Sequence, residues 1–309
     1  MNNSESQTVK HDDITLKVEG ISKSFGDFRA VGDLSFNVKA GRIFGFLGPN
    51  GAGKTTTIRM IVGITIPDTG RISLYGSQIT PQIRDRIGYL PEERGLYKKM
   101  KVNDQLRYFA ALKGVAQKEA DKRIDFWLDR MNLTEWKLKK TTDLSKGMSQ
   151  KLQFISTVLH EPDLLILDEP FSGLDPVNVE FMKEVIAEIK SQDKTIIFST
   201  HLMETAEQLC DDIILLNKSQ KVISGSLREI KESYGKNVIS LRCTGGEAVL
   251  KDPELVSNYV EHADVKEVFL AEKADSQKLL ERLIESGATI TRFELIEPSL
   301  NDIFIDKVS

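Results

Sequence analysis

The sequence predicts an α/β fold in which a sheet rich in parallel strands carries an inserted helical segment and a small α+β domain follows. Two short apolar runs, 43–47 and 164–167, have the length and composition of strands buried on both faces. Apolar and aromatic residues at helical spacing dominate the chain from about 93 to 143. Beyond residue 228, alternating strands and two helices follow without a catalytic cluster, which indicates a separate small domain.

Composition restricts the class of protein. A chain of 309 residues suggests two domains, and 40% hydrophobic with 28% charged residues is typical of soluble globular proteins. The net charge of −4 argues against a general nucleic-acid-binding surface. No apolar run approaches the roughly 18 residues of a bilayer-spanning helix, and the polar start lacks a secretory signal. Cys210 and Cys243 are far apart and are expected to be core thiols in a reducing compartment.

The first part of the chain predicts a polar tail and a small antiparallel sheet. Alternation at 14–18 predicts an edge strand, residues 21–26 a turn, and alternation at 34–38 another strand. The tail is too polar to pack into a core and is expected to be disordered. We therefore expect three parts: a tail at 1–12, a first domain at 13–228 and an accessory domain at 229–309.

The stretch from Gly48 to Thr55 fits the phosphate-loop pattern G-x-x-x-x-G-K-[ST]. It follows the apolar run 43–47 and precedes a predicted helix at about 56–66, so strand, loop and helix stand in the required order. Backbone N–H groups of such a loop surround phosphates, Lys54 can reach the β- and γ-phosphates, and the Thr55 hydroxyl can ligate Mg²⁺. The alternative interpretation is a glycine-rich turn before a helix.

The segment after about residue 93 predicts a helical subdomain inserted into the α/β core. Together with the helix that follows, this subdomain extends over about 93–160. Its lysine clusters, Lys98-Lys99 and Lys137 to Lys140, are interpreted first as solvated helix faces. A surface for a membrane partner is the alternative.

Two carboxylates directly follow the apolar strand 164–167. Asp168 and Glu169 are therefore expected at the carboxyl edge of the sheet, where α/β proteins bind ligands. Acids beside four buried aliphatic residues are costly without a cation, so a plain turn is the weaker interpretation. His201 follows the strand 195–198 at the same edge, although its position alone favours an ordinary histidine at a helix start.

In this order, the motifs resemble those of the ATP-binding subunits of ABC transporters over about residues 14–228. The matching segments are Gly48 to Thr55 (Walker A), Leu144 to Gln150 (the LSGGQ signature), Leu164 to Glu169 (Walker B), Ser172 to Asp175 (the D-loop) and His201 (the switch histidine). Lys146 and Met148 replace two usual residues of the signature. The resemblance implies a P-loop NTPase core with an antiparallel β subdomain and an inserted helical subdomain, plus the small C-terminal α+β domain.

By this resemblance the site binds ATP with Mg²⁺ and hydrolyses ATP. Glu169 is the expected general base, His201 contacts the γ-phosphate, and Lys54 neutralises phosphate charge. The expected metal ligands are Thr55, Asp168 and Glu92. Contacts to the nucleotide are expected from Phe25, Val31, Gly48, Pro49, Asn50, Gly51, Ala52, Gly53, Lys54, Thr55, Thr56, Ser145, Gly147, Met148 and Ser149.

Two of these residues carry particular questions. From the residues alone, Phe25 either stacks on a base or fills the core; it stands where the family has its adenine-stacking aromatic residue, which favours stacking. Glu92 occupies the place of the family's usual glutamine. A carboxylate there strengthens metal ligation but repels the γ-phosphate. Together with the C-terminal domain, the Glu92 loop resembles the subfamily associated with sodium or drug export.

The resemblance also implies partners. Two cassettes, identical or related, are expected to pair head to tail, so that the signature of one caps the ATP of the other. A separate permease is expected to dock on the helical subdomain and to hold the chain at the cytoplasmic face of the cell membrane, with no nucleic acid involved. Two alternatives stay open: a soluble ABC ATPase acting in translation or DNA maintenance, and a regulatory ATP-binding module with little turnover. The single phosphate loop argues against the first, and Glu169 with His201 against the second.

Overall fold

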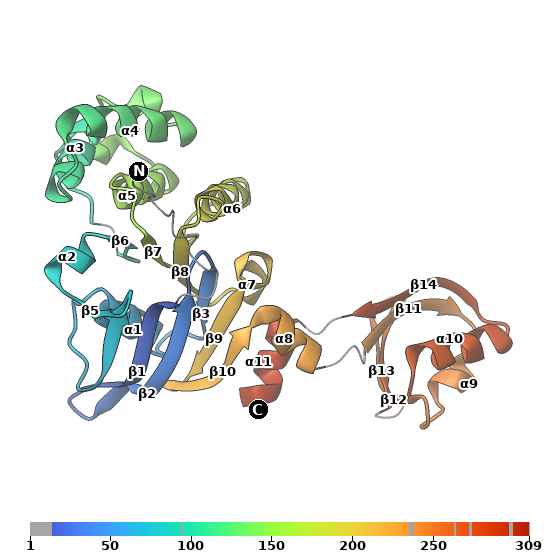
Figure 1. Cartoon of the computed structure of the whole chain (residues 1–309). Coiled ribbons are helices and arrows are strands. Elements are labelled where there is room, and N and C mark those ends of the chain that lie inside the picture. The colour runs from blue at the N-terminus through green and yellow to red at the C-terminus, as the bar shows by residue number, and fades with distance from the viewer. Residues whose placement is uncertain are drawn as a thin grey trace, which may run out of the picture. The chain divides into compact units, whose positions relative to one another are not determined.

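The computed structural model describes residues 14–93, 95–234, 238–262, 264–271, 274–296 and 299–308 (Figure 1). The chain divides into two compact units, Met1–Gly225 and Ser226–Ser309, which are described separately below. The expected polar tail at 1–12 lies outside the described residues. Across the described ranges, no helix is both long and apolar enough to cross a membrane.

The first unit is built on a six-stranded sheet with the order β10-β9-β3-β8-β7-β6. Its strands are β3 (Ile43–Leu47), β6 (Ile87–Leu90), β7 (Leu164–Asp168), β8 (Thr195–Thr200), β9 (Asp212–Asn217) and β10 (Gln220–Ser226). The pairs β3–β8, β3–β9, β7–β8 and β6–β7 are parallel, as the buried apolar runs predict. β9 and β10 are neighbours in the sheet and form a hairpin, whose two turn residues, Lys218 and Ser219, both have positive φ.

A second, antiparallel sheet has the order β2-β1-β4-β5. It consists of β1 (Ile14–Phe25), β2 (Phe28–Lys39), β4 (Thr69–Leu74) and β5 (Ser77–Gln78). The prediction of an edge strand at 14–18 is wrong, because β1 pairs with both β2 and β4. The predicted turn at 21–26 is also wrong over most of its length. Register shifts near Ile21 and a positive φ at Gly20 let the strand continue through bulges to Phe25.

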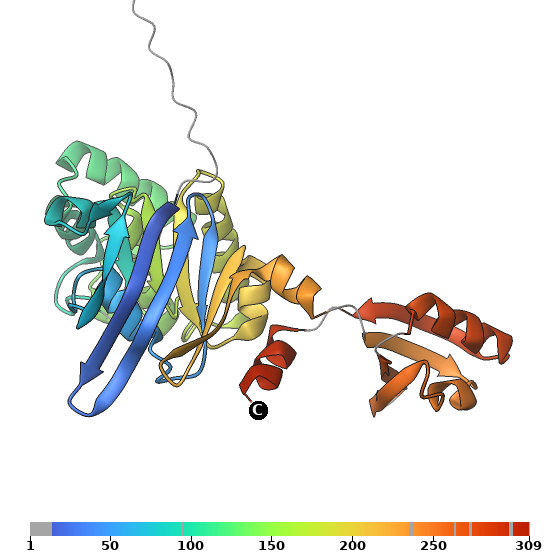
Figure 2. The same ribbon diagram turned by 60° about the horizontal axis from the view of Figure 1, so that its bottom comes forward.

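The central sheet lies between two layers. Alternate residues of its strands face opposite sides: Phe44 and Ile197 pack with the antiparallel sheet, whereas Ile43 and Phe198 pack with the helices. Figure 2 shows the antiparallel sheet on one side of the central strands and the helical segment on the other. Because both faces are covered, the strands read as continuous apolar runs.

The predicted helical subdomain contains three main helices, α3 (Val102–Leu112), α4 (Gln117–Arg130) and α5 (Lys146–Val158). α3 and α4 each bury residues four positions apart, which places them on one face of the helix. These residues are Val102, Leu106 and Ala110 in α3, and Ala120, Ile124 and Leu128 in α4. The other helices of this unit are α1 (Lys54–Ile61), α2 (Pro81–Arg84), α6 (Pro176–Lys190) and α7 (Met203–Leu209). α6 extends over 15 residues, while the helix expected at about 56–66 begins two residues earlier and ends at Ile61.

The second unit begins and ends with a helix, and between these helices it has the order strand, helix, two strands, helix, strand. Its elements are α8 (Leu227–Ser233), β11 (Val238–Thr244), α9 (Glu247–Leu250), β12 (Val256–His262), β13 (Val265–Leu270), α10 (Ser276–Glu285), β14 (Thr289–Ile296) and α11 (Leu300–Val308). The sheet order β12-β13-β11-β14 with antiparallel pairs is that of the ferredoxin-like βαββαβ unit. The sequence did not predict β12, since a register shift between Val256 and Asn258 interrupts its alternation.

Candidate functional site

The glycine-rich loop lies between β3, in the interior of the central sheet, and α1. Its backbone packs so closely against neighbouring strands that side chains are excluded at two points. A Cβ atom on Gly48, which has φ 141°, would lie 2.1 Å from the carbonyl oxygen of Leu216, and one on Gly53, with φ 102°, would lie 2.5 Å from that of Ala30. Only glycine fits there, so the loop has a fixed backbone conformation.

This loop borders a pocket with a volume of about 220 Å³. Four separate segments converge on it: the start of β2, the loop with α1, the turn after β6 and the turn after β7. The lining residues are Phe28, Ala30, Asn50, Gly51, Gly53, Lys54, Thr55, Thr56, Glu92 and Glu169. The structure thus brings Glu92 and Glu169 to the predicted phosphate loop from positions far along the chain.

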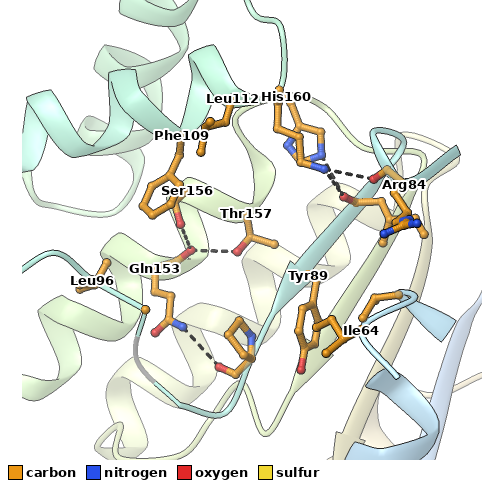
Figure 3. A pocket seen from close by; sticks show the side chains of 15 residues that line it. Ile64, Arg84, Tyr89, Leu96, Phe109, Leu112, Gln153, Ser156, Thr157 and His160 are labelled. Carbon is orange, nitrogen blue, oxygen red and sulfur yellow. Dashed lines mark hydrogen bonds between the residues drawn. The ribbon is translucent and has the colours of Figure 1, made fainter. Parts of the chain in front are cut away.

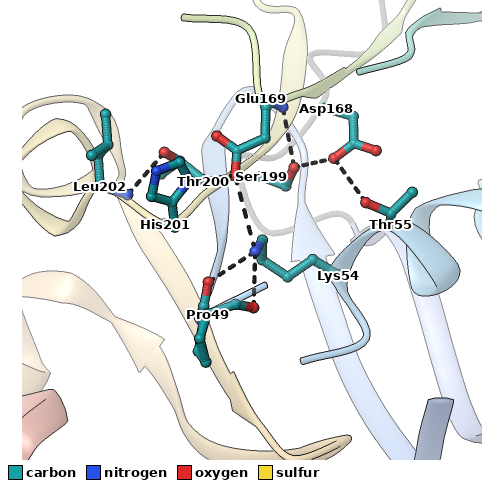
Figure 4. A network of polar contacts seen from close by, with 10 residues as sticks. Pro49, Lys54, Thr55, Asp168, Glu169, Ser199, Thr200, His201 and Leu202 are labelled. Atoms are coloured by element: carbon teal, nitrogen blue, oxygen red, sulfur yellow. Dashed lines mark hydrogen bonds and ion pairs between the residues drawn. The ribbon is translucent and has the colours of Figure 1, made fainter. Parts of the chain in front are cut away.

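Lys54 is almost completely buried at the first turn of α1 (Figure 4). Its Nζ atom donates hydrogen bonds to the carbonyl oxygens of Gly48 (2.8 Å) and Pro49 (3.2 Å) and lies 3.9 Å from Oε1 of Glu169. Burial lowers the pKa of Lys54, and the carboxylates of Glu169, Asp168 and Glu92 oppose that change. The ammonium group is therefore a desolvated cation beside an open pocket, where a phosphate would be attracted strongly.

Asp168 is fully buried and offers one free oxygen atom. Its Oδ1 accepts hydrogen bonds from the hydroxyl groups of Ser199 and, at 3.4 Å, Thr55. Its Oδ2 is buried and has no hydrogen-bond partner within the part of the chain that the structure describes. A buried carboxylate oxygen without a partner is costly, and a divalent cation would remove that cost. The pair Asp168 and Thr55 therefore fits Mg²⁺, a cation that prefers oxygen ligands.

Glu169 is 8% exposed and has a positive φ of 50°, an unusual conformation for a residue other than glycine. Its N–H donates to the backbone oxygen of Ser199 at 3.2 Å. Its Oε1 lies 2.9 Å from Nδ1 of His201, whose ring is half exposed (Figure 4). Strained backbone held in place by neighbours is a feature of functional sites. The predicted base and the predicted switch histidine are thus in direct contact.

One aromatic residue that lines the pocket, Phe28, was not among the expected contacts. Phe25 is 54% exposed at the end of β1, so it does not fill the core. Phe28, its partner across the hairpin turn, is 60% exposed and lines the pocket, as does Ala30. Val31, an expected nucleotide contact, is 2% exposed and belongs to the core between the two sheets. The sequence analysis did not include Phe28 and Ala30 because it placed the turn too early. If the strand had been continued to Phe25, the next strand would have begun near Phe28.

The signature residues lie at the start of α5 and outside this pocket. Ser145 is the N-cap, and its Oγ accepts a hydrogen bond from the N–H of Met148 at 3.2 Å. Ser149 donates to the carbonyl oxygen of Ser145, and Gly147 approaches Leu174. Among the described residues that line the pocket, none comes from this segment. The fold of one chain therefore does not bring Ser145, Gly147, Met148 and Ser149 to its own phosphate loop.

Two family models match the chain. One, described as ABC transporter, matches residues 31–172. The other, described as ATP-binding protein DrrA1-3-like, C-terminal domain, matches residues 225–308. The two matches correspond to the sequence region with the phosphate loop and to the second compact unit.

Relatives match along almost the whole length. An uncharacterised ABC transporter ATP-binding protein of Bacillus subtilis (strain 168) is 48% identical over 293 residues, which cover 95% of this chain and 98% of the relative. Another from Methanocaldococcus jannaschii is 40% identical and covers 94% of this chain and 98% of the relative. The Nod factor export ATP-binding protein I of Burkholderia lata is 34% identical over 94% of this chain and 95% of its own length.

A solved structure, described as the ATP binding subunit of an ABC transporter, is similar to the chain with a TM-score of 0.67 and 32% identity. The similarity covers 72% of this chain and 93% of the solved one. A second, cbiO1 from Clostridium perfringens, part of an ABC transporter complex, has a TM-score of 0.64 and 27% identity.

Proposed function

Because the chain belongs to the ATP-binding subunits of ABC transporters, a family of ATPases, we propose that it hydrolyses ATP at the Lys54 pocket to power a separate membrane permease. The observation that carries the proposal is the convergence on one carboxylate. Oε1 of Glu169 lies 3.9 Å from Nζ of Lys54 and 2.9 Å from Nδ1 of His201. A cation beside the phosphates and an oriented base for the attacking water are groups that catalyse phosphoryl transfer to water.

Each residue of the site has a distinct task in this mechanism. Lys54 exchanges its contacts with the loop carbonyl groups for phosphate oxygens, and the loop N–H groups complete the cradle. Thr55 and Asp168 would hold Mg²⁺, directly or through water and with Glu92 nearby, and the bound ion neutralises phosphate charge. Glu169 accepts a proton from the attacking water, and His201 fixes the orientation of that carboxylate.

The proposed active form contains two cassettes. Ser145 begins α5, and the N-terminus of a helix favours anions, yet this segment lies away from the pocket of its own chain. In a head-to-tail pair, the segment from Ser145 to Ser149 caps the ATP held by the other cassette. ATP then acts as a ligand that favours the closed dimer, and hydrolysis releases it. The cassette comprises residues 13–228 and the accessory domain residues 229–309.

A second cavity of the first unit suits the permease. It has a volume of about 370 Å³ and lies between α3, α5 and β6 (Figure 3). Its lining combines apolar and aromatic side chains with a few basic ones, among them Tyr89, Leu96, Phe109, Leu112, Arg84 and Lys113. We infer that an apolar segment of the permease, carrying an acidic residue opposite Arg84 and Lys113, docks in this groove.

Export is the proposed direction. The 34% identical relative from Burkholderia lata is named for the export of Nod factor, and the second unit matches a DrrA1-3-like C-terminal domain. These similarities support export, and we propose that the exported solutes are sodium ions, drugs or similar compounds. In this proposal the chain is cytoplasmic and attaches to the inner face of the cell membrane through its permease.

The variant Glu169→Gln with ATP and Mg²⁺ tests the proposal. The amide cannot accept the proton, so ATP persists and the variant should form a stable dimer that wild type forms only transiently. Size-exclusion chromatography with light scattering measures the mass, and phosphate release is followed in parallel for wild type. A wild type that neither hydrolyses ATP nor pairs when permease-containing membranes are added would contradict the proposal and favour a regulatory module.

A further inference from the structure

One buried hydroxyl group links the two carboxylate residues of the site. Ser199 belongs to β8, is 0% exposed and stands in register with Asp168 of β7 and Phe46 of β3. Paired residues of neighbouring strands direct their side chains to the same face of a sheet. The fold therefore places the Ser199 hydroxyl beside the Asp168 carboxylate.

The hydroxyl of Ser199 both donates and accepts a hydrogen bond (Figure 4). It donates a short hydrogen bond to Oδ1 of Asp168. Its oxygen accepts a hydrogen bond from the N–H of Glu169 at 3.3 Å. A single side chain thus contacts the expected metal-binding carboxylate and the backbone of the expected base, which is held at a φ of 50°.

We propose that Ser199 is a positioning residue that fixes the Asp168 carboxylate for the divalent cation. The donated hydrogen bond occupies Oδ1 and sets the plane of the carboxylate, so that Oδ2 stays without a partner among the described residues and is available to the ion. Hydrogen bonds to the ligands of a metal orient those ligands and strengthen binding. Thr55 shares Oδ1 at 3.4 Å, a long contact that its hydroxyl can exchange for the metal.

The inference rests on the proposed function, since it assigns a role at the same site. Phe46, Asp168 and Ser199 are all fully buried, so water cannot replace the hydroxyl easily. Without it, the carboxylate can rotate and the N–H of Glu169 keeps only the backbone oxygen of Ser199. Both changes should lower the affinity for the nucleotide with Mg²⁺ more than the affinity for the nucleotide without Mg²⁺.

The test compares nucleotide affinity with and without the cation and does not require turnover. Binding of ADP to wild type and to Ser199→Ala is measured by isothermal titration calorimetry in Mg²⁺ and in EDTA. The ratio of the two dissociation constants is the Mg²⁺ gain. We expect this gain to fall about tenfold in Ser199→Ala, equivalent to about 1.4 kcal/mol, while affinity in EDTA changes little. A purely structural defect would lower both affinities together.

Two further variants control for folding. Thr195→Val removes another buried hydroxyl at the other end of β8, where it contacts Thr15 and the N–H of Gly41, and should keep the full gain. Ser199→Cys replaces the hydroxyl with a somewhat larger group that is a weaker donor and should show an intermediate gain; it also replaces Ser199→Ala if that variant does not fold. An undiminished Mg²⁺ gain in a folded Ser199 variant would overturn this inference but leave the proposed function intact. A wild type with no Mg²⁺ gain would contradict the proposed function as well.

Discussion

Two cavities of the first unit differ in the chemistry of the side chains that line them. The smaller one, of about 220 Å³, gathers Lys54, Glu92 and Glu169 around the phosphate loop. The larger one, of about 370 Å³, presents Tyr89, Phe109 and other apolar side chains with basic groups at its margin. Charge is concentrated at the proposed site of phosphate chemistry, and apolar surface at the proposed docking groove.

Although their linings differ, the two cavities share one short segment, and this segment can couple them. Pro91 lines the apolar groove, and the next residue, Glu92, lines the phosphate pocket. Gln153 of α5 holds this segment: its Nε2 donates to the carbonyl oxygens of Pro91 (3.3 Å) and Glu93 (3.1 Å). Occupancy of one cavity can therefore shift the segment that completes the other, so changes at each cavity should have separable effects.

The largest effect on nucleotide binding is expected from Lys54→Met. The variant removes a buried cation whose hydrogen bonds would pass to the phosphates, so the dissociation constant for ATP should rise about a hundredfold. Equilibrium binding of a fluorescent ATP analogue measures it. Lys194→Met is the control, because Lys194 contacts Glu161 and Asp163 rather than the pocket. Equal affinity of Lys54→Met and wild type would remove Lys54 from the phosphate site.

A smaller effect is expected from Leu112→Glu in the apolar groove. Leu112 is 61% exposed there, so the change should not disturb the core. A charge in an apolar docking surface should reduce co-purification with the permease about tenfold or more and leave the ATPase rate of the isolated subunit unchanged. Phe126→Glu is the control, since Phe126 is similarly exposed but lies outside this groove. Full retention of the permease by Leu112→Glu would place the docking site elsewhere.

A modest effect is expected from Glu92→Gln. The amide is a weaker ligand than the carboxylate, so the Mg²⁺ concentration for half-maximal ATPase activity should rise roughly threefold. Loss of one negative charge should also improve ATP affinity slightly. Titration of activity with Mg²⁺ at fixed ATP measures the shift, with Glu93→Gln as the control because its side chain does not line the pocket. Identical Mg²⁺ curves for Glu92→Gln and wild type would exclude Glu92 as a ligand.

The last prediction concerns how the stability of the protein depends on pH through His160, which lines the groove. Burial and the nearby Lys113 lower the pKa of His160 from 6.5 to about 4, while its Nε2 donates to the carbonyl oxygen of Ile87 at 3.2 Å. The unfolded chain takes up this proton at a higher pH than the folded one. Stability is therefore complete above pH 6.5 and falls as the pH drops toward 4. Urea denaturation measures the free energy of unfolding at pH 7 and at pH 4.5. The decrease between the two should be about 1 kcal/mol smaller in His160→Gln than in wild type. An equal decrease in both proteins would contradict this role of His160.

The sequence predicted most of the site because its chemistry depends on short contiguous segments. The phosphate loop needs glycine where Leu216 and Ala30 approach, and a buried strand carries Asp168 to the sheet edge. These requirements leave visible patterns in the residues. The positions of Lys54, Thr55, Asp168 and Glu169 relative to one another follow from the parallel register of β3, β7 and β8.

What the sequence did not predict depends on contacts between distant segments or on irregular backbone. Bulges carry β1 past the expected turn to Phe25, and Phe28, the first residue of β2, lines the pocket. A register shift hides the alternation of β12 in the second unit. Ser199 carried no motif, and only its pairing with Asp168 across two strands shows what its hydroxyl contacts.

The most direct measurement is the rate of ATP hydrolysis by Glu169→Gln at saturating ATP and Mg²⁺, beside wild type and with nucleotide binding measured on the same samples. If Glu169 accepts the proton of the attacking water, the rate falls by about 10²–10⁴-fold while ATP is still bound. A rate within about twofold of wild type would mean that Glu169 is not the base, and the polar cavity would lose its assigned chemistry.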